Sequence, residues 1–536
     1  MHTELLFRDE ARTKLLAGAN AVADAVRATL GPEARSVLLE RKWGTPLVCD
    51  DGVTITKQIK LKDQVENLGA QLLRNAASET GDAVGDGTTT STLLAHAIFS
   101  EGVRNVVVGT SAVGIKRGLQ RGLDAAIGSL HELSRPVKDR TDTEHVATVS
   151  AHNDPEIGRL VADAVDQVGP EGVVEVEEAK GTETMLEVVE GMQLDKGYLS
   201  PYFVTDPERM EAVVDRPLVL LVDRKITAVN ELLPVLEEVA KSGRGILIIA
   251  ETVEGEALAA LVVNRLRGSL AAAAVKAPGF GERRKAMLED IGILTGTRPV
   301  SEELGRKLEA VTVDELGSAE RVVITKDTTT IIGGGGDPGA VNGRCDELRR
   351  QIKDTTSDYD REKLEERLAK LSGGVALIRV GAISEAELKR QKEAFDDAIS
   401  STKAAVAEGI VPGGGAALLR TIDAVEAEEQ RCEGVERVGV HILRNALEIP
   451  ARQIAKNAGI DDGPVVEKIR NGTGFFGFDA RTKDFAELDE RGIIDPTKVV
   501  RIALQNAVAV AGVLLLAEAT MVEVEEEAPP QLPEFG

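Results

Sequence analysis

Cysteine is scarce in this sequence, and the few cysteines lie far apart. Cys49, Cys345 and Cys432 are the only three in 536 residues. Disulfide frameworks and zinc motifs both need cysteines that recur at short spacings. The sequence therefore predicts neither, and it is typical of a protein kept in a reducing compartment. The six histidines also lack the spacing of metal ligands.

Positive charge is in deficit. The 64 lysines and arginines stand against 89 aspartates and glutamates, so the net charge is −25. Nucleic-acid binding needs a basic face, and the composition argues against it. No run of about 18 apolar residues is apparent. The charged stretch 1–18 lacks the apolar core of a secretory signal. We therefore expect no membrane span and a cytoplasmic location.

Apolar periodicity predicts helical ends around an alternating middle. Segments 11–30, 63–79 and 88–109 show helical spacing, and alanine-rich helical patterns return after about residue 397. Strands and helices alternate in the middle, which is typical of an α/β domain. The predicted strands there are 217–223, 245–251 and 271–278, and the predicted helices are 230–243 and 254–268.

Two further segments carry local predictions. The stretch 45–59 has the pattern of two short strands around a turn at Asp50, Asp51 and Gly52. The end of the chain, 523–536, combines an acidic run with three prolines, which predicts disorder.

The stretch GDGTTTST (85–92) places glycine and threonine, both poor helix formers, directly before an apolar helical pattern. A helix N-terminus offers free N–H groups and partial positive charge, which suits a phosphate, and Asp86 could hold Mg²⁺. Equally, Asp86 or a threonine could simply cap the helix. The stretch alone does not decide between these interpretations. A Walker A loop, GxxxxGK[ST], does not occur.

Two other glycine-rich stretches are weaker signals. GGGGDPG (333–339) contains a literal GxGxxG, but we expect no apolar helix after it, so a hairpin or loop is favoured over a dinucleotide site. GIVPGGG (409–415) leads from a strand-like piece into a helical pattern. It fits either a ligand-binding turn or a plain loop.

Aromatic residues are rare, yet two of the three tyrosines lie in GYLSPYF (197–203). Such a cluster can form an exposed apolar site. Helical segments around 233–236 and 258–263 are apolar over more than one face. For these segments the pattern alone favours ordinary core packing.

Taken together, these motifs resemble one known family. AAVAEGIVPGGG (404–415) closely resembles the signature of the group I chaperonins, the GroEL type. The motifs ATLGP, GDGTTT, EGMQLDKGYLSPYF, VKAPGFGERRKAML, DYDREKLEERLAKLSGGVA and GIIDPTKV resemble that family in order and spacing, over about residues 5–522.

The resemblance implies a mixed α/β, multi-domain, GroEL-like fold. Its parts would be a mostly α-helical equatorial domain, a small intermediate domain and an α/β apical domain. The implied boundaries are 1–133 and 409–522 for the equatorial domain, 134–190 and 375–408 for the intermediate domain, 191–374 for the apical domain and 523–536 for the disordered tail.

The resemblance also implies an ATPase that uses Mg²⁺ and K⁺. Asp397 is implied to activate the attacking water with help from Asp51, and Asp86 to hold Mg²⁺. The backbone carbonyl of Asp50 is implied to hold the monovalent cation. The other implied nucleotide contacts are Thr29, Leu30, Gly31, Pro32, Gly87, Thr88, Thr89, Thr90, Gly414, Asp479, Ala480 and Asp495.

The implied activity is ATP-dependent capture of non-native polypeptides on an apolar apical surface. Enclosure would follow beneath a GroES-type co-chaperonin lid, in two stacked rings of seven copies. Gly191, Gly374 and Gly409 fall at the family's hinges. The implied apical residues are Tyr198, Tyr202, Phe203, Leu233, Leu236, Leu258, Val262 and Val263.

The sequence departs from the family at three places, and the first and last of these keep an alternative open. Asp50 stands where lysine is usual, Asp479 stands where asparagine is frequent, and the Gly-Gly-Met tail is absent. An assembled but weakly active paralogue is therefore the alternative. A group II chaperonin would carry a lid insertion, which we do not find. A small-molecule kinase would need lysine or arginine in GDGTTTST.

Overall fold

The computed structural model describes residues 2–40, 46–169, 172–179, 181–207, 209–301, 307–355 and 357–524. These residues form two compact units. Unit 1 comprises Met1–Ala162 and Arg390–Gly536, and unit 2 comprises Asp163–Lys389, each within the described ranges. The fold is mixed α/β and multi-domain, as the sequence predicts.

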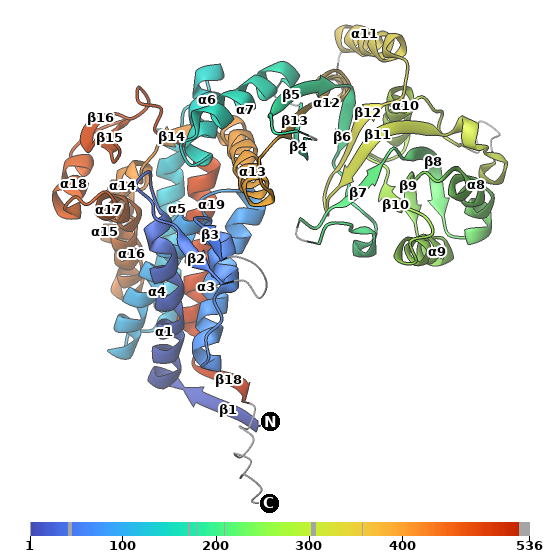
Figure 1. The fold of residues 1–536 in the computed structure, drawn as a ribbon. Helices are drawn as coiled ribbons and strands as arrows, with labels where there is room; N and C mark the ends of the chain where they lie inside the picture. Colours follow the sequence, from blue (N-terminus) through green and yellow to red (C-terminus); the bar gives the residue numbers. More distant parts are fainter. Residues whose placement is uncertain are drawn as a thin grey trace, which may run out of the picture. The chain divides into compact units, whose positions relative to one another are not determined.

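Unit 1 is mostly helical. Figure 1 shows α1, α3, α4, α5 and α19 running side by side. Its helices are α1 (Arg8–Val26), α2 (Gly52–Gln58), α3 (Gln64–Val84), α4 (Thr88–Val107), α5 (Ala112–Leu133), α6 (Arg140–Ser150), α14 (Ala416–Arg420), α15 (Ile422–Arg431), α16 (Gly434–Ala446), α17 (Ile449–Asn457), α18 (Asp462–Arg470) and α19 (Thr497–Leu516). The chain passes between the units within α7 (Pro155–Val168) and α13 (Glu385–Glu408).

Short antiparallel strand pairs complete unit 1. They join β1 with β18, β2 with β3, β14 with β17, and β15 with β16. Their bounds are β1 (His2–Phe7), β2 (Val37–Leu39), β3 (Leu47–Cys49), β14 (Ile410–Pro412), β15 (Phe476–Asp479), β16 (Asp484–Glu487), β17 (Ile494–Pro496) and β18 (Ala519–Val524).

Helix α19 forms the centre of unit 1. It contacts α3, α4 and α5, and most of its alanine, valine and leucine side chains are buried. By length and composition it is apolar enough to cross a membrane, contrary to our expectation that no such run exists. However, 61% of the most apolar 18-residue stretch of this helix is buried inside the structure. Core helices of other proteins can be equally long and apolar. The membrane signal is therefore weak.

The two chain ends meet in unit 1. Strand β1 pairs with β18, with His2 opposite Val524. Glu523 and Val524, predicted to begin a disordered tail, thus belong to a strand. The rest of that predicted tail, 525–536, lies outside the described residues.

The prediction of two strands within 45–59 is half wrong. Strand β3 is present, but the second half forms helix α2. The reason is a cap: the Asp51 carboxylate accepts the N–H groups of Val53 at 3.2 Å and Thr54 at 2.7 Å. Such a cap satisfies the free donors at a helix start.

Unit 2 contains the predicted α/β arrangement. Strands β8, β9 and β10 are parallel, and α8 and α9 connect them as the alternating pattern predicts. Its helices are α8 (Val229–Ser242), α9 (Gly255–Leu266), α10 (Glu282–Thr295), α11 (Pro338–Asp354) and α12 (Asp358–Ser372). Its strands are β4 (Val173–Glu178), β5 (Met185–Val189), β6 (Gly191–Leu194), β7 (Ala212–Asp215), β8 (Leu218–Ile226), β9 (Ile246–Val253), β10 (Ala272–Lys276), β11 (Gly317–Ile324), β12 (Thr329–Gly334) and β13 (Val375–Val380).

Two sheets organise unit 2. A seven-stranded sheet has the order β10-β9-β8-β11-β12-β6, with β7 paired to β11. A three-stranded sheet has the order β4-β13-β5, in which β13 is parallel to β4 and antiparallel to β5. The main core lies between the large sheet and its helices.

The glycine-rich stretch 333–339 contains a loop that joins a strand to a helix, which confirms the prediction of a loop. Strand β12 ends at Gly334, and the charged helix α11 begins at Pro338 behind an Asp337 cap. The glycines allow close packing against the end of α10. A β-carbon on Gly336 would lie 2.0 Å from the carbonyl oxygen of Ile293. Protein atoms fill the space that these glycines leave, namely backbone at Gly336 and side chains at Gly333 and Gly335.

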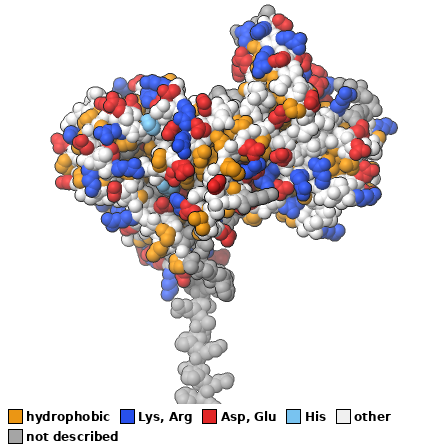
Figure 2. Space-filling view, turned by 45° about the horizontal axis from the view of Figure 1, so that its top comes forward, with side chains coloured by type: hydrophobic (Ala, Val, Ile, Leu, Met, Phe, Trp, Pro, Cys, Tyr) orange, Lys and Arg blue, Asp and Glu red, His pale blue; other side chains and the backbone are white. Residues whose placement is uncertain are grey.

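Surface charge is mixed in sign. Figure 2 shows acidic and basic side chains interspersed over the visible face.

Candidate functional site

A cavity of about 680 Å³ lies in unit 1. It brings together segments that are distant in the sequence: the end of α1, the loop before α2, the α3–α4 turn, the α6–α7 turn, α13 and the strands near α19. Every residue of the predicted nucleotide site lines it, namely Thr29, Leu30, Gly31, Pro32, Asp51, Asp86, Gly87, Thr88, Thr89, Thr90, Asp397, Gly414, Asp479, Ala480 and Asp495.

Two glycines build the α3–α4 turn. Gly85 ends α3 at φ +74°, and Gly87 precedes α4 at φ +78°. Both angles lie in the left-handed region, where a side chain is strained. No side chain caps α4, so the simple capping interpretation of Asp86 or a threonine is wrong. Asp86 instead accepts the N–H of Gly87. The N–H groups of the first turn of α4 thus remain available to an anion.

The threonines of this turn are packed closely. Thr88 and Thr89 are buried, and Thr89 Oγ1 lies 3.3 Å from Thr29 Oγ1, which joins the end of α1 to the start of α4. Gly52 lies directly against them, since a β-carbon there would be 2.7 Å from Thr89 Oγ1. The hydroxyl groups therefore have fixed positions at the base of the cavity.

Acidic side chains concentrate in the same cavity. Burial, followed by the charges of Asp86 and Asp51, raises the pKa of Asp397 well above its usual value. Burial and the charge of Asp86 raise the pKa of Asp495 to about 7. Both shifts come first from burial and then from the repulsion of neighbouring carboxylates. Nearby positive charge would relieve this repulsion.

The carboxylates suit a metal that is shared with a ligand. Among the described residues no group of three or more histidine, cysteine, aspartate or glutamate side chains is placed to hold a metal. Mg²⁺ typically takes one or two protein carboxylates and completes its shell with water and phosphate oxygens. Asp86 fits that mode, because it lies beside the uncapped start of α4.

The opposite end of the cavity contains tight turns. Gly414 and Gly415 have φ of +63° and +78°, and a β-carbon on Gly415 would lie 2.7 Å from the backbone nitrogen of Ala451. Asp479 is buried and accepts the N–H groups of Arg481 and Thr482. An asparagine oxygen could accept these same bonds, so this turn tolerates either residue.

Sequence reasoning missed several residues of this site. His152 lines the cavity, and its Nδ1 lies 3.8 Å from Asp50 Oδ2. Ser150 and Ser401 contact the Asp86 carboxylate. No spacing pattern marks these residues, because they come from α6, the α6–α7 turn and α13 and meet only in the fold.

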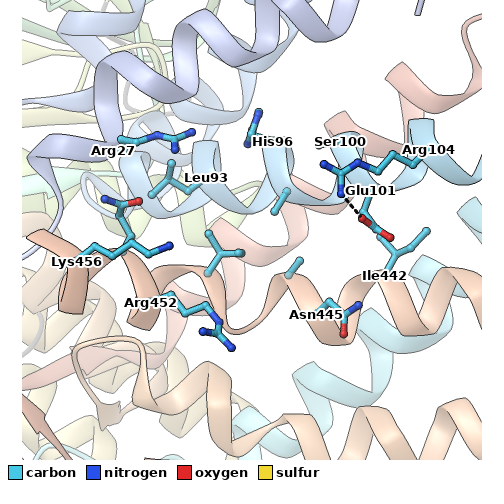
Figure 3. A pocket seen from close by; sticks show the side chains of 14 residues that line it. Arg27, Leu93, His96, Ser100, Glu101, Arg104, Ile442, Asn445, Arg452 and Lys456 are labelled. Carbon is cyan, nitrogen blue, oxygen red and sulfur yellow. Dashed lines mark hydrogen bonds and ion pairs between the residues drawn. The ribbon is translucent and has the colours of Figure 1, made fainter. Parts of the chain in front are cut away.

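A second cavity of unit 1, of about 320 Å³, is lined by four basic side chains: Arg27 just after α1, Arg104 of α4, and Arg452 and Lys456 of α17 (Figure 3). Each of these four basic side chains forms an ion pair with an acidic residue. Their positive charge is therefore already compensated, which disfavours binding of an anion in this cavity. It also lacks a motif from the sequence. The pairs are Arg27–Asp24 at 2.6 Å, Arg104–Glu101 at 3.2 Å, Arg452–Asp462 at 2.7 Å and Lys456–Asp462 at 3.7 Å.

The predicted apical residues lie in unit 2 and differ in exposure. Tyr202, Leu233 and Val263 are exposed, at 63%, 45% and 43%. Phe203 and Leu236 are instead core residues, at 1% and 6%. The prediction that these two residues contact a ligand directly is therefore wrong for this conformation, because both side chains pack beneath the surface. The half-buried members are Tyr198, Leu258 and Val262.

Comparison with known proteins gives a consistent result. The TCP-1/cpn60 chaperonin family matches residues 22–525. A relative from Bradyrhizobium diazoefficiens, "Chaperonin GroEL 5", is 62% identical over 533 residues, which cover 99% of this chain and 98% of the relative.

Proposed function

Because the chain belongs to the TCP-1/cpn60 chaperonin family and is a chaperone of the GroEL type, we propose that the large cavity of unit 1 binds and hydrolyses ATP to drive protein folding. One observation carries the proposal: the uncapped start of α4, its buried threonines, Asp86 and Asp397 all meet in one cavity. The identity of 62% over nearly the whole chain does not favour the weakly active paralogue.

The phosphate groups of ATP would lie at the start of α4. The free N–H groups and helix dipole favour negative charge there. The hydroxyls of Thr88, Thr89 and Thr90 would add donors. Gly87 has a left-handed backbone and allows Val499 to pack against this turn, since a β-carbon there would lie 2.8 Å from Val499 Cγ1.

The charge of the cavity requires cations along with the nucleotide. Six aspartates line it, against two arginines and two histidines. A polyanion would be repelled unless cations accompany it. Asp86 would hold Mg²⁺, which supplies neutralising charge to the phosphate oxygens. The backbone carbonyl of Asp50, also at this cavity, would take K⁺.

Asp397 would accept the proton of the attacking water. Its raised pKa in the free site reflects burial and neighbouring carboxylates, and cations would lower it toward the value needed for a base. Asp51 would assist through its charge, because the N–H groups of α2 hold its carboxylate in place. Asp495 and Asp479 would line the nucleoside.

The catalytic assignment is tested by steady-state ATP hydrolysis of the wild type and the Asp397→Ala variant. We expect the variant to lose hydrolysis by roughly 10²-fold or more while still binding ADP, since a missing base spares ground-state binding. Equal rates for the two proteins would exclude Asp397 as the base.

The polypeptide and the lid would bind the exposed apolar side chains of unit 2. Tyr202, Leu233 and Val263 provide the apolar surface that non-native chains seek. Tyr202→Glu should abolish capture of an unfolded substrate and leave ATP hydrolysis unchanged. Unchanged capture would refute this surface, and Met210→Glu, at another exposed apolar residue of unit 2, is the control.

The larger organisation is proposed from the family. It comprises the three domains with the boundaries above, two stacked rings of seven, a GroES-type co-chaperonin and a cytoplasmic location. Two of the predicted hinge glycines have left-handed backbones that support the assignment: Gly374 at φ +67° and Gly409 at φ +81°. Particle images with nucleotide and lid protein would test the assembly directly.

A further inference from the structure

Two serines hold the Asp86 carboxylate. Ser150 Oγ donates to Asp86 Oδ2 at 2.8 Å, and Ser401 Oγ lies 3.3 Å from the same oxygen. The two hydroxyl oxygens are 2.9 Å apart. Each hydroxyl has one proton, so both serines can donate to Asp86 when the contact between them is not a hydrogen bond. We call this group of three side chains the serine clamp.

The serine clamp is buried. Ser401 is 0% exposed and Ser150 is 8% exposed. A buried hydroxyl is costly without hydrogen-bond partners, and the clamp supplies them. The two serines are therefore placed to act on Asp86 rather than on solvent.

The serine clamp joins three separate elements. Asp86 precedes α4, Ser150 ends α6, and Ser401 lies within α13. Asp397 is four residues before Ser401 on α13, so the two side chains lie on the same helix face. Fixing Ser401 against Asp86 thus also sets the position of Asp397 relative to the start of α4.

Gly85 permits this approach. A β-carbon on Gly85 would lie 2.4 Å from the β-carbon of Ser400. The absence of a side chain lets α13 come close enough for the neighbouring Ser401 to reach Asp86. Two independent features, the glycine and the clamp, therefore bring α13 to the same turn.

The serine clamp leaves Asp86 free to bind a cation. Its Oδ1 accepts the N–H of Gly87, and its Oδ2 contacts the serines. A carboxylate has about four acceptor positions, so capacity remains on the side of the cavity. Groups that hydrogen-bond a metal ligand orient it and tune its affinity.

We propose that Ser150 and Ser401 are positioning residues that orient Asp86 for Mg²⁺ and couple it to Asp397. The inference rests on the proposed ATP site and adds residues that the family resemblance did not assign. The clamp transmits the position of α13 to the metal ligand. Loss of either hydroxyl lets the carboxylate rotate away from its cavity-facing orientation.

The test measures equilibrium binding of ADP by calorimetry at a series of Mg²⁺ concentrations. Ser150→Ala and Ser401→Ala should raise the Mg²⁺ concentration required for half-maximal binding by about 10- to 100-fold. Binding at saturating Mg²⁺ should change little. In steady-state hydrolysis of ATP, kcat should fall more than KM rises.

Matched variants separate positioning from packing. Ser91→Ala removes another buried hydroxyl of α4, which donates to the carbonyl oxygen of Ala76 at 2.9 Å. It should lower thermal stability without shifting the Mg²⁺ requirement. Ser150→Thr keeps a hydroxyl and should restore a near-normal requirement. If Ser401→Ala does not fold, the less buried Ser150 still provides the test.

The Asp86→Asn variant tests the proposed metal ligand separately from the two serines. We expect it to abolish the Mg²⁺ dependence of ADP binding. If it does so while both serine variants behave like Ser91→Ala, the serine clamp is refuted and the proposed metal ligand survives. If Asp86→Asn leaves the dependence unchanged, the metal role and the clamp are both refuted.

Discussion

Replacing Asp290 by alanine should loosen the attachment of α11 and α12 to α10 in unit 2. Asp290 lies on α10 and is 1% exposed. Arg344 of α11 donates to Oδ1 at 2.8 Å, and Arg367 of α12 donates to Oδ2 at 2.7 Å and to Oδ1 at 3.0 Å. One buried carboxylate therefore forms ion pairs with guanidinium groups from two helices.

The expected loss of stability depends on which other ion pairs each arginine keeps when Asp290 is replaced. Arg344 keeps Glu347 at 2.8 Å and Glu289 at 3.2 Å, so its loss is partly compensated. Within the described part of the chain, Arg367 forms an ion pair with Asp290 alone, and its side chain is only 14% exposed. Breaking a buried pair by removing one partner costs about 3–5 kcal/mol. Because one arginine is compensated, we expect about 3 kcal/mol.

Hydrogen exchange measured by mass spectrometry is the suitable assay, since a multi-unit chain lacks a single unfolding free energy. A cost of about 3 kcal/mol corresponds to roughly 100-fold faster exchange at about 1.4 kcal/mol per factor of ten. The amides of α11 and α12 should show this faster exchange, whereas the amides of α4 and α19 in unit 1 should exchange as in the wild type.

The control is Glu289→Ala, which removes an exposed partner of Arg344 at 3.2 Å. Exposed pairs contribute about 0–1 kcal/mol, so exchange should rise less than about fivefold. If Asp290→Ala behaves like this control, the buried carboxylate does not anchor the two helices and the reasoning fails.

Three further predictions concern the site, acid stability and the apolar surface. Gly85→Ala should weaken ADP binding at least about tenfold in calorimetry, because its β-carbon would strain the turn and press on α13. Burial alone would raise the pKa of Asp142, but Arg135 and Lys138 together lower it through hydrogen bonds and positive charge. The Asp142 interactions therefore stabilise the protein above about pH 4, and this stability is lost as the pH falls through the lowered pKa. Thermal melts between pH 3 and 6 should therefore show a shallower acid decline for Asp142→Asn. Leu233→Ala should reduce substrate capture with little change in stability, because Leu233 is exposed. Leu236→Ala should instead destabilise unit 2 by about 2–5 kcal/mol, because Leu236 is buried. A lower melting temperature for Leu233→Ala and weaker capture by a stable Leu236→Ala would contradict the observed exposures.

Local sequence patterns predict most of the secondary structure here. The alternating middle appears as β8, α8, β9, α9 and β10, because buried strands and amphipathic helices have distinct periods. The helix patterns around the α3–α4 turn also appear. The error at 45–59 has a local cause, since a single cap by Asp51 favoured a helix over a second strand.

The candidate site is less accessible to local patterns. GDGTTTST alone left a helix cap and a phosphate cradle equally open. The fold decides against a side-chain cap, since Gly87 precedes α4 and Asp86 turns to Ser150. Likewise, periodicity could not distinguish core packing from an exposed apolar patch. In the structure Phe203 is a core residue, whereas Tyr202 is exposed.

The sequence by itself determined the family, the order of elements and the residue types of the nucleotide site, because motifs such as GDGTTTST and GIVPGGG are contiguous. Only the tertiary structure decided which carboxylates share a cavity, which apolar side chains reach the surface, and that Ser150 and Ser401 hold Asp86. The physical reason is distance along the chain. Residues separated by 64 and 315 positions interact only after α6 and α13 have packed beside the start of α4.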